Sequence, residues 1–417
     1  MKVLIVSQYF WPENFRVNDL ATELANRGHQ VTVLTGLPNY PDGQIFDTYQ
    51  QDPQKFINYH GVKVVRVPLL PRGHGSLRLV LNYLSYVVTA CTAGPWKLRG
   101  QDFDVVLTNQ LSPVTVGIPA SLLSWLKNAP MAMWVLDLWP DTLHALGTVR
   151  SPRLLRLVGK LVSFIYRRCD LILAQSRSFI PQIRKLAGRE QRVEYFPSWA
   201  EDVFQNTTNV MPASEVPQQI GTFNIMFAGN IGESQDFPCI LDAAERLRGQ
   251  SNIRWLIVGD GRMANWTQSE VEKRNMEDQV LLLGRHPLDR MPAFFAHADA
   301  MLVTLANQPI FGMTIPGKLQ SYLATGKPIV AALNGEGADL IERTRSGIAV
   351  PAGNAQALAD AVLALSRLST QARAEMGAAG LLASREEFDR STIITKMESW
   401  LGELIRGHVH KRVAHRN

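Results

Sequence analysis

The sequence is poor in cysteine and has no long hydrophobic run. Its three cysteines, Cys91, Cys169 and Cys239, are far apart and lack the spacing of metal ligands. This excludes a disulfide framework and a cysteine-based metal site and favours a reducing cytosol. No stretch holds eighteen clean apolar residues, so no segment is expected to cross a bilayer. The predicted first strand, residues 3–6, leaves no room before it for a signal peptide. These absences predict a cytoplasmic protein.

A strong excess of one charge is also missing. The 417 residues include 43 Lys and Arg against 37 Asp and Glu, which gives a net charge of +6 and a pI near 9.2. This diffuse excess does not indicate nucleic acid, but it suits phosphorylated ligands or an anionic membrane. The hydrophobic content of 46% is typical of a globular protein, and the length predicts two domains.

The stretch around which the chain is organised is residues 312–332, GMTIPGKLQSYLATGKPIVAA. Pro316 fits the first turn of a helix and Gly326 its left-handed end, and apolar runs flank the helix on both sides. This order of strand, loop, helix and strand predicts a parallel sheet, which binds ligands beyond the carboxyl ends of its strands. The helix start and Lys318 would hold a phosphate there. An ordinary crossover with a solvated lysine is the alternative.

Alternating strands and helices occur in two series. The first series has predicted strands at 3–6, 31–34, 62–67, 105–108, 131–136 and 171–174, and the second has them at 223–228, 253–258, 280–283, 300–304 and 329–332. We therefore predict an α/β protein with two doubly wound, Rossmann-like domains and a cleft between them. The expected bounds are 1–200 and 222–385, with a polar linker at 201–221. A closing helix and a basic tail that frays are expected at 386–417.

Polar residues follow the first strand of the first domain. The loop SQYFWPENFR carries Glu13, Asn14 and Arg16, and Asn18 lies on the next helical turn. Their position at a carboxyl strand end favours ligand contact, although the aromatic residues of this loop could simply pack against the domain.

Two carboxylates follow the predicted strand at residues 131–136. Asp137 or Asp141 could act as a general base or orient a hydroxyl group. Alternatively, Asp141 caps the next helix, which Pro140 would also suit.

Two predicted helical segments of the first domain are accompanied by basic residues. Residues 77–91 are almost continuously apolar, with Arg72, His74 and Arg78 at their front. A buried helix is favoured for the middle of this segment, and a membrane-facing helix is the alternative. Residues 153–168 predict a basic amphipathic helix, which we interpret as a solvated face.

Six stretches resemble, in order, motifs of the retaining glycosyltransferases of family four. They read SQYFWPENFRVNDLATELANRGHQVTVLTGLPNYPDG, VLDLWPD, FAGNIGESQDF, LIVGDG, LLGR and IPGKLQSYLATGKPIVA. The resemblance spans nearly the whole chain, and the ordered set is specific although each motif alone is weak. The sequence is most similar to bacterial O-antigen and capsule enzymes that transfer N-acetyl-L-fucosamine. The resemblance implies the GT-B fold, with an acceptor-binding first domain and a second domain that binds the nucleotide sugar.

The resemblance also implies roles for individual residues. Gly229 and Gly232 would lie near the diphosphate, Lys318 at the phosphate-facing helix start, and Arg285 in the loop that lines the base pocket. The full expected donor set is Gly229, Asn230, Gly232, Gln235, Arg285, Pro316, Gly317, Lys318 and Ser321. The expected catalytic residues are Asp137, Asp141 and Lys318, and the expected acceptor-binding residues are Glu13, Asn14, Arg16 and Asn18. No metal motif is present, and no cofactor is expected beyond the UDP-sugar as co-substrate.

The chain departs from the family pattern at five positions. Asn230 and Gln235 stand where many members have Arg and Lys on the glycine loop. Met313 and Ser321 stand at the positions of two glutamates spaced E-x7-E, and Leu136 replaces a histidine. The order of the remaining motifs still favours an active enzyme.

The predicted function is transfer of a sugar, such as N-acetyl-L-fucosamine, from a UDP-sugar with retention. The acceptor would be a saccharide linked to undecaprenyl diphosphate, and the protein would attach peripherally to the inner face of the cytoplasmic membrane. A UDP-sugar epimerase of the same fold, or a non-catalytic protein that binds sugar nucleotides, is the alternative.

Overall fold

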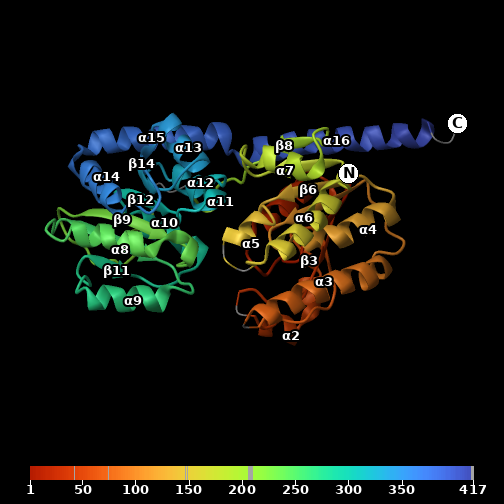
Figure 1. Cartoon of the computed structure of the whole chain (residues 1–417), viewed down its shortest axis with the longest axis horizontal. Helices are drawn as coiled ribbons and strands as arrows, with labels where there is room; N and C mark the ends of the chain where they lie inside the picture. The colour runs from red at the N-terminus through yellow and green to blue at the C-terminus, as the bar shows by residue number, and fades with distance from the viewer. Residues whose placement is uncertain (42, 74, 146, 148, 205–209, 415–417) are drawn as a thin grey trace. The chain divides into compact units, whose positions relative to one another are not determined.

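The computed structural model divides into two compact units (Figure 1). Unit 1 comprises Met1–Phe196 and Ser391–Asn417, and unit 2 comprises Pro197–Arg390. The structure describes residues 1–41, 43–73, 75–145, 147, 149–204 and 210–414. His74 of the sequence analysis lies outside the described residues. The chain passes between the units twice, after Phe196 and after Arg390.

Unit 1 is built on one mostly parallel sheet. Its described strands follow the order β3-β4-β2-β1-β5-β6-β7-β8, and the short β3–β4 pair is antiparallel. The bounds are β1 Lys2–Val6, β2 Gln30–Thr35, β3 Asn58–Tyr59, β4 Val62–Arg66, β5 Val105–Gln110, β6 Met131–Val135, β7 Leu171–Ala174 and β8 Val193–Tyr195. Val3 pairs with Val31 on one side and Val105 on the other. The strand order therefore reverses between β1 and β5, where parallel sheets bind ligands.

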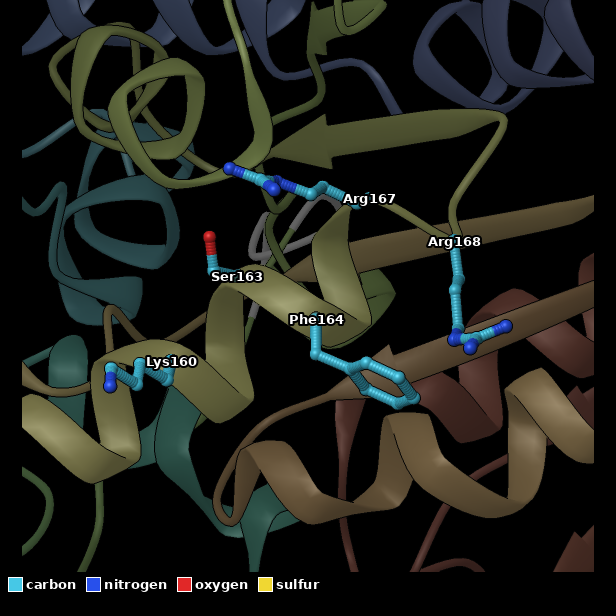
Figure 2. Close-up of a pocket in the computed structure, with 5 residues that line it drawn as sticks. All are labelled: Lys160, Ser163, Phe164, Arg167 and Arg168. Atoms are coloured by element: carbon cyan, nitrogen blue, oxygen red, sulfur yellow. The ribbon is translucent and has the colours of Figure 1, made fainter.

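Helices cover the sheet of unit 1. They are α1 Arg16–Asn26, α2 Asp47–Gln51, α3 Ser76–Lys97, α4 Gly117–Lys127, α5 Asp141–Ala145, α6 Pro152–Tyr166 and α7 Phe179–Ala187, with 3-10 turns at Pro53–Phe56 and Val114–Val116. Helix α3 packs on α4, α4 on α6 and α6 on α7, so these four helices form a continuous row. Beside α6 lies a wide pocket of about 580 Å³ (Figure 2).

Unit 2 has a parallel sheet in the order β11-β10-β9-β12-β13-β14. Its described strands are β9 Phe223–Ala228, β10 Ile253–Val258, β11 Val280–Leu282, β12 Ala300–Thr304, β13 Ile329–Ala332 and β14 Gly347–Val350. Successive side chains point to opposite faces. Ile225 and Phe227 accordingly pack into one hydrophobic core and Met226 and Ala228 into the other. Both faces are buried, which explains why the strands read as continuous apolar runs.

The helices of unit 2 pack on both faces of its sheet. They are α8 Phe237–Arg246, α9 Ala264–Lys273, α10 Met291–Phe295, α11 Pro309–Gly312, α12 Gly317–Ala324, α13 Glu336–Thr344, α14 Ala355–Arg367 and α15 Thr370–Glu387. Three 3-10 turns lie at Asp202–Phe204, Glu233–Gln235 and Leu288–Arg290. The strand β9 adjoins both β10 and β12, so the strand order of this sheet reverses at the carboxyl end of β9.

The burial predicted for the middle of residues 77–91 holds for one side of the helix and not for the other. Leu77, Val80, Leu81, Leu84 and Val88 of α3 are 73%, 49%, 39%, 52% and 60% exposed. They recur every three or four residues and form one apolar stripe, here called the α3 stripe. The opposite side of α3 supplies buried residues such as Tyr86 and Ala90, so the helix is apolar on both sides but buries only one of them.

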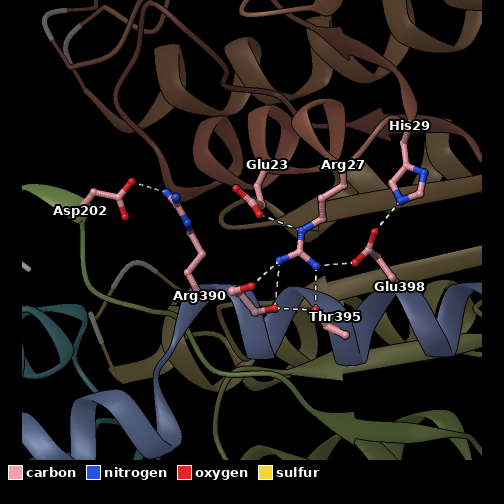
Figure 3. Close-up of polar contacts among 8 residues, drawn as sticks. Glu23, Arg27, His29, Asp202, Arg390, Thr395 and Glu398 are labelled. Atoms are coloured by element: carbon pink, nitrogen blue, oxygen red, sulfur yellow. Dashed lines mark hydrogen bonds and ion pairs between the residues drawn. The ribbon is translucent and has the colours of Figure 1, made fainter.

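The basic tail is helical as far as the structure describes it. Helix α16 runs from Arg390 to Ala414. Arg27 donates hydrogen bonds to Glu398 and Thr395 at 2.6 and 2.7 Å, and His29 Nε2 lies 2.6 Å from Glu398 (Figure 3). Further along the helix, His408 Nε2 lies 3.1 Å from the carbonyl oxygen of Asn128. These side-chain contacts fix α16 on unit 1 over most of its length.

Candidate active site

The glycine loop of unit 2 lies directly after β9. Gly229 has φ +136°, and a Cβ atom there would come within 2.5 Å of Lys318 Cε. Gly259, after β10, has φ +149°, and its Cβ would lie 1.9 Å from the carbonyl oxygen of Gly229. Both positions therefore need glycine, because the backbones of two loops and the side chain of Lys318 meet there.

Lys318 is the central charged group of this loop cluster. Its Nζ atom is buried, has no hydrogen-bond partner among the described residues and lies 3.8 Å from the centre of the Phe227 ring. Burial lowers the pKa of Lys318 to about 7. A buried ammonium without a counter-ion is unfavourable, and an anion bound beside it would restore its charge. The structure thus brings Lys318 and Gly229 together at a place that suits an anion.

Helix α12 is held against the end of β9 by a residue that the sequence analysis missed. The Tyr322 hydroxyl donates to the carbonyl oxygen of Ala228 at 2.9 Å and accepts from the backbone N–H of Ala228 at 2.8 Å. Pro316 is the N-cap residue and Gly317 is the exposed first residue of the helix. Tyr322 therefore fixes the position of α12 against the end of β9, where the glycine loop begins.

Ser321 lies one turn after the start of α12 and contacts a carboxylate. Its hydroxyl donates a hydrogen bond to Glu201 Oε2 at 2.6 Å. Ser321 occupies one of the two positions at which the glycosyltransferases of family four carry glutamate. A carboxylate is therefore present beside this position, although it comes from a residue 120 places earlier in the chain. The sequence analysis missed Glu201 because nothing local marks such a long-range contact.

The other predicted donor residues lie on the loops around this cluster. Asn230 Nδ2 lies 3.5 Å from Gln235 Oε1, and a Cβ on Gly232 would come within 2.6 Å of the same Asn230 atom. These three residues are thus close neighbours. Arg285 is exposed in the loop after β11.

The loop after β1 is organised by its own polar residues. Glu13 is buried and accepts hydrogen bonds from the backbone N–H groups of Phe10, Asn39 and Tyr40 at 3.2, 2.8 and 2.8 Å. Burial raises the pKa of Glu13 to about 7. Because its carboxylate oxygens are already engaged, Glu13 shapes the loop from within.

The three other predicted acceptor residues are in different environments. Asn18 is buried, accepts from the backbone N–H of Trp11 at 3.1 Å and donates to the carbonyl oxygen of Glu13 at 2.7 Å. Asn14 is exposed, and Arg16 lies 3.5 Å from Asp19. Asn14 is therefore the exposed member of this set, and Arg16 is only partly exposed.

Asp137 lies at the carboxyl end of β6 among polar side chains. It accepts hydrogen bonds from the Thr142 hydroxyl and, at 3.2 Å, from Trp139 Nε1. Burial raises the pKa of Asp137 above its usual range. Asp141 is exposed in the first turn of α5.

A small tyrosine cluster that the sequence analysis missed lies on one side of this carboxyl group. The hydroxyl of Tyr83 on α3 lies near Asp137, Ser112, Arg72 and Tyr9. Burial raises the pKa of the Tyr83 hydroxyl above its usual range. A buried carboxyl group next to hydroxyl groups can bind and orient a sugar hydroxyl.

Two family descriptions match the chain, one in each unit. "Glycosyl transferase 4-like domain" matches residues 14–199 and "Glycosyl transferases group 1" matches residues 222–367. The chain is 27% identical over 270 residues to the probable glycosyltransferase WbjE of Pseudomonas aeruginosa, covering 63% of this chain and 66% of that protein. It is 25% identical over 351 residues to the putative colanic acid biosynthesis glycosyl transferase WcaI of Escherichia coli, covering 78% of this chain and 82% of that protein.

Solved structures with the same fold cover nearly the whole chain. HepE of Anabaena, in complex with UDP and glucose, has a TM-score of 0.69 at 18% identity and covers 97% of this chain and 100% of its own. Sucrose-phosphate synthase of Thermosynechococcus elongatus has a TM-score of 0.73 at 14% identity and covers 97% of this chain and 99% of its own. The fold is therefore GT-B, and the chain belongs to the group 1 glycosyltransferases.

Proposed function

We propose that this glycosyltransferase moves a sugar from a UDP-sugar to a lipid-linked saccharide during the synthesis of a bacterial surface polysaccharide, with retention at the anomeric carbon. The names of WbjE and WcaI and the UDP bound to HepE support this proposal. The resemblance to family four supports retention and an N-acetylated deoxyhexose such as N-acetyl-L-fucosamine. The acceptor in this proposal is linked to undecaprenyl diphosphate.

The observation that carries the proposal is the buried, unpartnered Nζ of Lys318 beside the glycine loop. Transfer releases a nucleoside diphosphate, whose negative charge grows in the transition state. A preorganised cation in a dry site stabilises that charge more than it stabilises the bound substrate. The start of α12, at Pro316 and Gly317, adds the positive end of a helix dipole. No metal ion is needed in this scheme.

The remaining donor residues complete the proposed site. The amide side chains of Asn230 and Gln235 would donate hydrogen bonds to the diphosphate oxygens. The diphosphate would approach the backbone closely at Gly232. Arg285 would contact the base. The Ser321–Glu201 pair would accept hydrogen bonds from hydroxyl groups of the donor.

The polar end of the sheet in unit 1 would bind the acceptor. Asp137 would accept a hydrogen bond from the attacking hydroxyl group or orient that group. Asp141 would lie beside Asp137. In this proposal Glu13 and Asn18 hold the loop in shape, and Asn14 and Arg16 contact the saccharide.

We place the protein on the inner face of the cytoplasmic membrane, as a peripheral protein. The α3 stripe supports this, because a row of exposed apolar residues beside Arg78 is the pattern of an interfacial helix. No helix within the described ranges is long and apolar enough to span a bilayer.

Calorimetry with free nucleotides tests the donor. We expect UDP to bind more tightly than GDP. GDP binding at least tenfold tighter than UDP, a difference of roughly 1.4 kcal/mol, would contradict the UDP assignment.

A further inference from the structure

The positive charge of the chain is concentrated in one segment of unit 1. Residues 150–189 contain ten lysines and arginines and one carboxylate, Asp170, whereas the whole chain has 43 basic and 37 acidic residues. All ten basic side chains are exposed. Asp170 accepts a hydrogen bond from the backbone N–H of Met131 at 2.8 Å. Outside this segment acidic residues slightly outnumber basic ones, so the modest net charge comes from this one segment of the chain.

Helix α6 carries a basic stripe beside an apolar one. Arg153, Arg156 and Lys160 are spaced three and four residues apart and share one side of the helix. Leu157 and Phe164, seven residues apart, are 63% and 49% exposed and follow the same side. The opposite side is buried through residues such as Val162, Ile165 and Tyr166. Exposed leucine and phenylalanine next to cations are typical of a helix that lies in the plane of a membrane interface.

Cationic side chains line the pocket beside α6 (Figure 2). It is lined by Lys160, Ser163, Phe164, Arg167 and Arg168 and has a volume of about 580 Å³. The guanidinium of Arg168 lies over the Phe164 ring, with 4.2 Å between Cζ and the ring centre. In the part of the chain that the structure describes, Lys160, Arg167 and Arg168 form no ion pair. A phosphate group in this pocket would receive charge-assisted hydrogen bonds from several side chains.

We infer that α6 and this pocket bind the phosphate headgroups of an anionic lipid bilayer, with Leu157 and Phe164 entering the interface. The positive charge of this surface requires an anionic partner. The exposed apolar side chains require a partner that also has a hydrocarbon region, as a lipid bilayer does. Nucleic acid would match the charge alone, and a free phosphate would match the pocket alone.

The position of α6 supports this partner. It belongs to the row of helices that begins with α3, so the α3 stripe and the α6 surface lie on the same helical layer. The inference rests on the proposed function in one respect: the α3 stripe, which lies on the same helical layer, is itself proposed to bind the membrane. It does not depend on the transfer reaction.

Flotation with vesicles tests the inference on the full chain. The vesicles are phosphatidylcholine alone or phosphatidylcholine mixed with phosphatidylglycerol. The variant is the triple charge reversal Lys160→Glu, Arg167→Glu and Arg168→Glu. The matched control reverses three exposed cations outside the segment, Arg367→Glu, Arg385→Glu and Lys396→Glu. We expect wild type and control to bind the anionic vesicles, and the α6 variant to bind about a hundredfold more weakly.

A second variant tests the apolar part of the surface. Leu157→Ser with Phe164→Ser should weaken vesicle binding by about tenfold or more. Both residues are exposed, so the fold should tolerate the changes. Vesicle binding by the α6 charge variant equal to that of wild type would overturn the inference. Equal losses in variant and control would also overturn it, because the effect would then follow net charge. A wild type that binds glycerol phosphate but not vesicles would show that the pocket takes a free anion instead.

Binding of UDP separates this inference from the proposed function. The α6 variants lie in unit 1 and should bind UDP as wild type does. A wild type that binds anionic vesicles but no nucleotide would contradict the proposed function and leave the lipid site supported.

Discussion

Lys318 shows most clearly how one residue links sequence, packing and proposed chemistry. Its long side chain passes Gly229, which has no Cβ to block it, and ends over the ring of Phe227. Burial lowers the pKa of Lys318 to about 7, so the free protein holds this amine close to its charge transition. A bound diphosphate would supply the anionic partner that the described residues do not provide for the Lys318 amine.

The substitution Lys318→Ala should reduce turnover by about a hundredfold, because loss of one donor to developing charge costs on the order of 3 kcal/mol. The loss of UDP affinity should be smaller, since the charge grows in the transition state. Lys318→Arg should recover part of the activity, because a planar guanidinium does not replace a compact ammonium. Steady-state kinetics on the folded variants measure this. If the turnover of Lys318→Ala stays within about threefold of wild type, Lys318 is an ordinary packed lysine and does not stabilise the leaving diphosphate.

The pH dependence of UDP binding gives a second test of the same residue. Above pH 7 the Lys318 amine of the free protein is largely neutral, and a bound diphosphate raises its pKa. Binding should therefore take up a proton, and UDP affinity should fall as pH rises above 7. The phosphate groups of UDP titrate near pH 6 and are fully ionised in this range.

Calorimetry at pH 8 in two buffers of different ionisation enthalpy measures the proton uptake. We expect a clear uptake by wild type and none by Lys318→Ala. The same uptake in both proteins would assign the proton to another group.

At the scale of elements, the α3 stripe makes a separate prediction. The double variant Leu77→Ser and Leu84→Ser should weaken binding to anionic vesicles by about tenfold or more, because two exposed leucines no longer enter the interface. Its thermal unfolding should match that of wild type, since both residues are exposed. Ile220→Ser with Leu382→Ser, two exposed residues of unit 2, is the matched control. Unchanged vesicle binding by the α3 variant would remove α3 from the membrane surface.

The anchor of α16 is a second element-scale prediction. Arg27→Ala removes hydrogen bonds to Glu398 and Thr395 and leaves the half-buried Glu398 without its guanidinium partner. Amide hydrogen exchange in residues 391–405 should become at least tenfold faster, because hydrogen bonds to charged groups contribute about 1.5–3 kcal/mol each. Arg248→Ala is the control, since its ion pair with Glu245 is exposed and should contribute little. Equal protection of α16 in Arg27→Ala and wild type would show that packing alone holds the helix.

The elements differ in how well the sequence predicts them. Strands such as Phe223–Ala228 and Ala300–Thr304 were predicted with the observed bounds, because buried parallel strands are short apolar runs between turn residues. Gly326 has the left-handed φ of +66° that its place after α12 required. The exposure of α3 could not be predicted, because a segment that is apolar on both sides does not show which side is buried. The hydrogen bond of Ser321 to Glu201 and the proximity of Tyr83 to Asp137 join distant parts of the chain and leave no local pattern.

At the scale of the whole molecule, each unit offers one half of the proposed reaction. Unit 2 holds Lys318 and the glycine loop, and unit 1 holds Asp137 with its tyrosine cluster. A transferase needs both a donor and an acceptor, whereas an epimerase or a binding protein needs the nucleotide sugar alone. The dependence of turnover on an acceptor therefore distinguishes the proposed function from both alternatives.

The most direct test is the release of nucleotide from a panel of UDP- and GDP-sugars, with and without membranes that contain lipid-linked saccharides. We predict that UDP is released only when a UDP-sugar and the acceptor are both present, and that the product keeps the anomeric configuration of the donor. An altered sugar formed without acceptor, or saturable binding without turnover, would contradict the account.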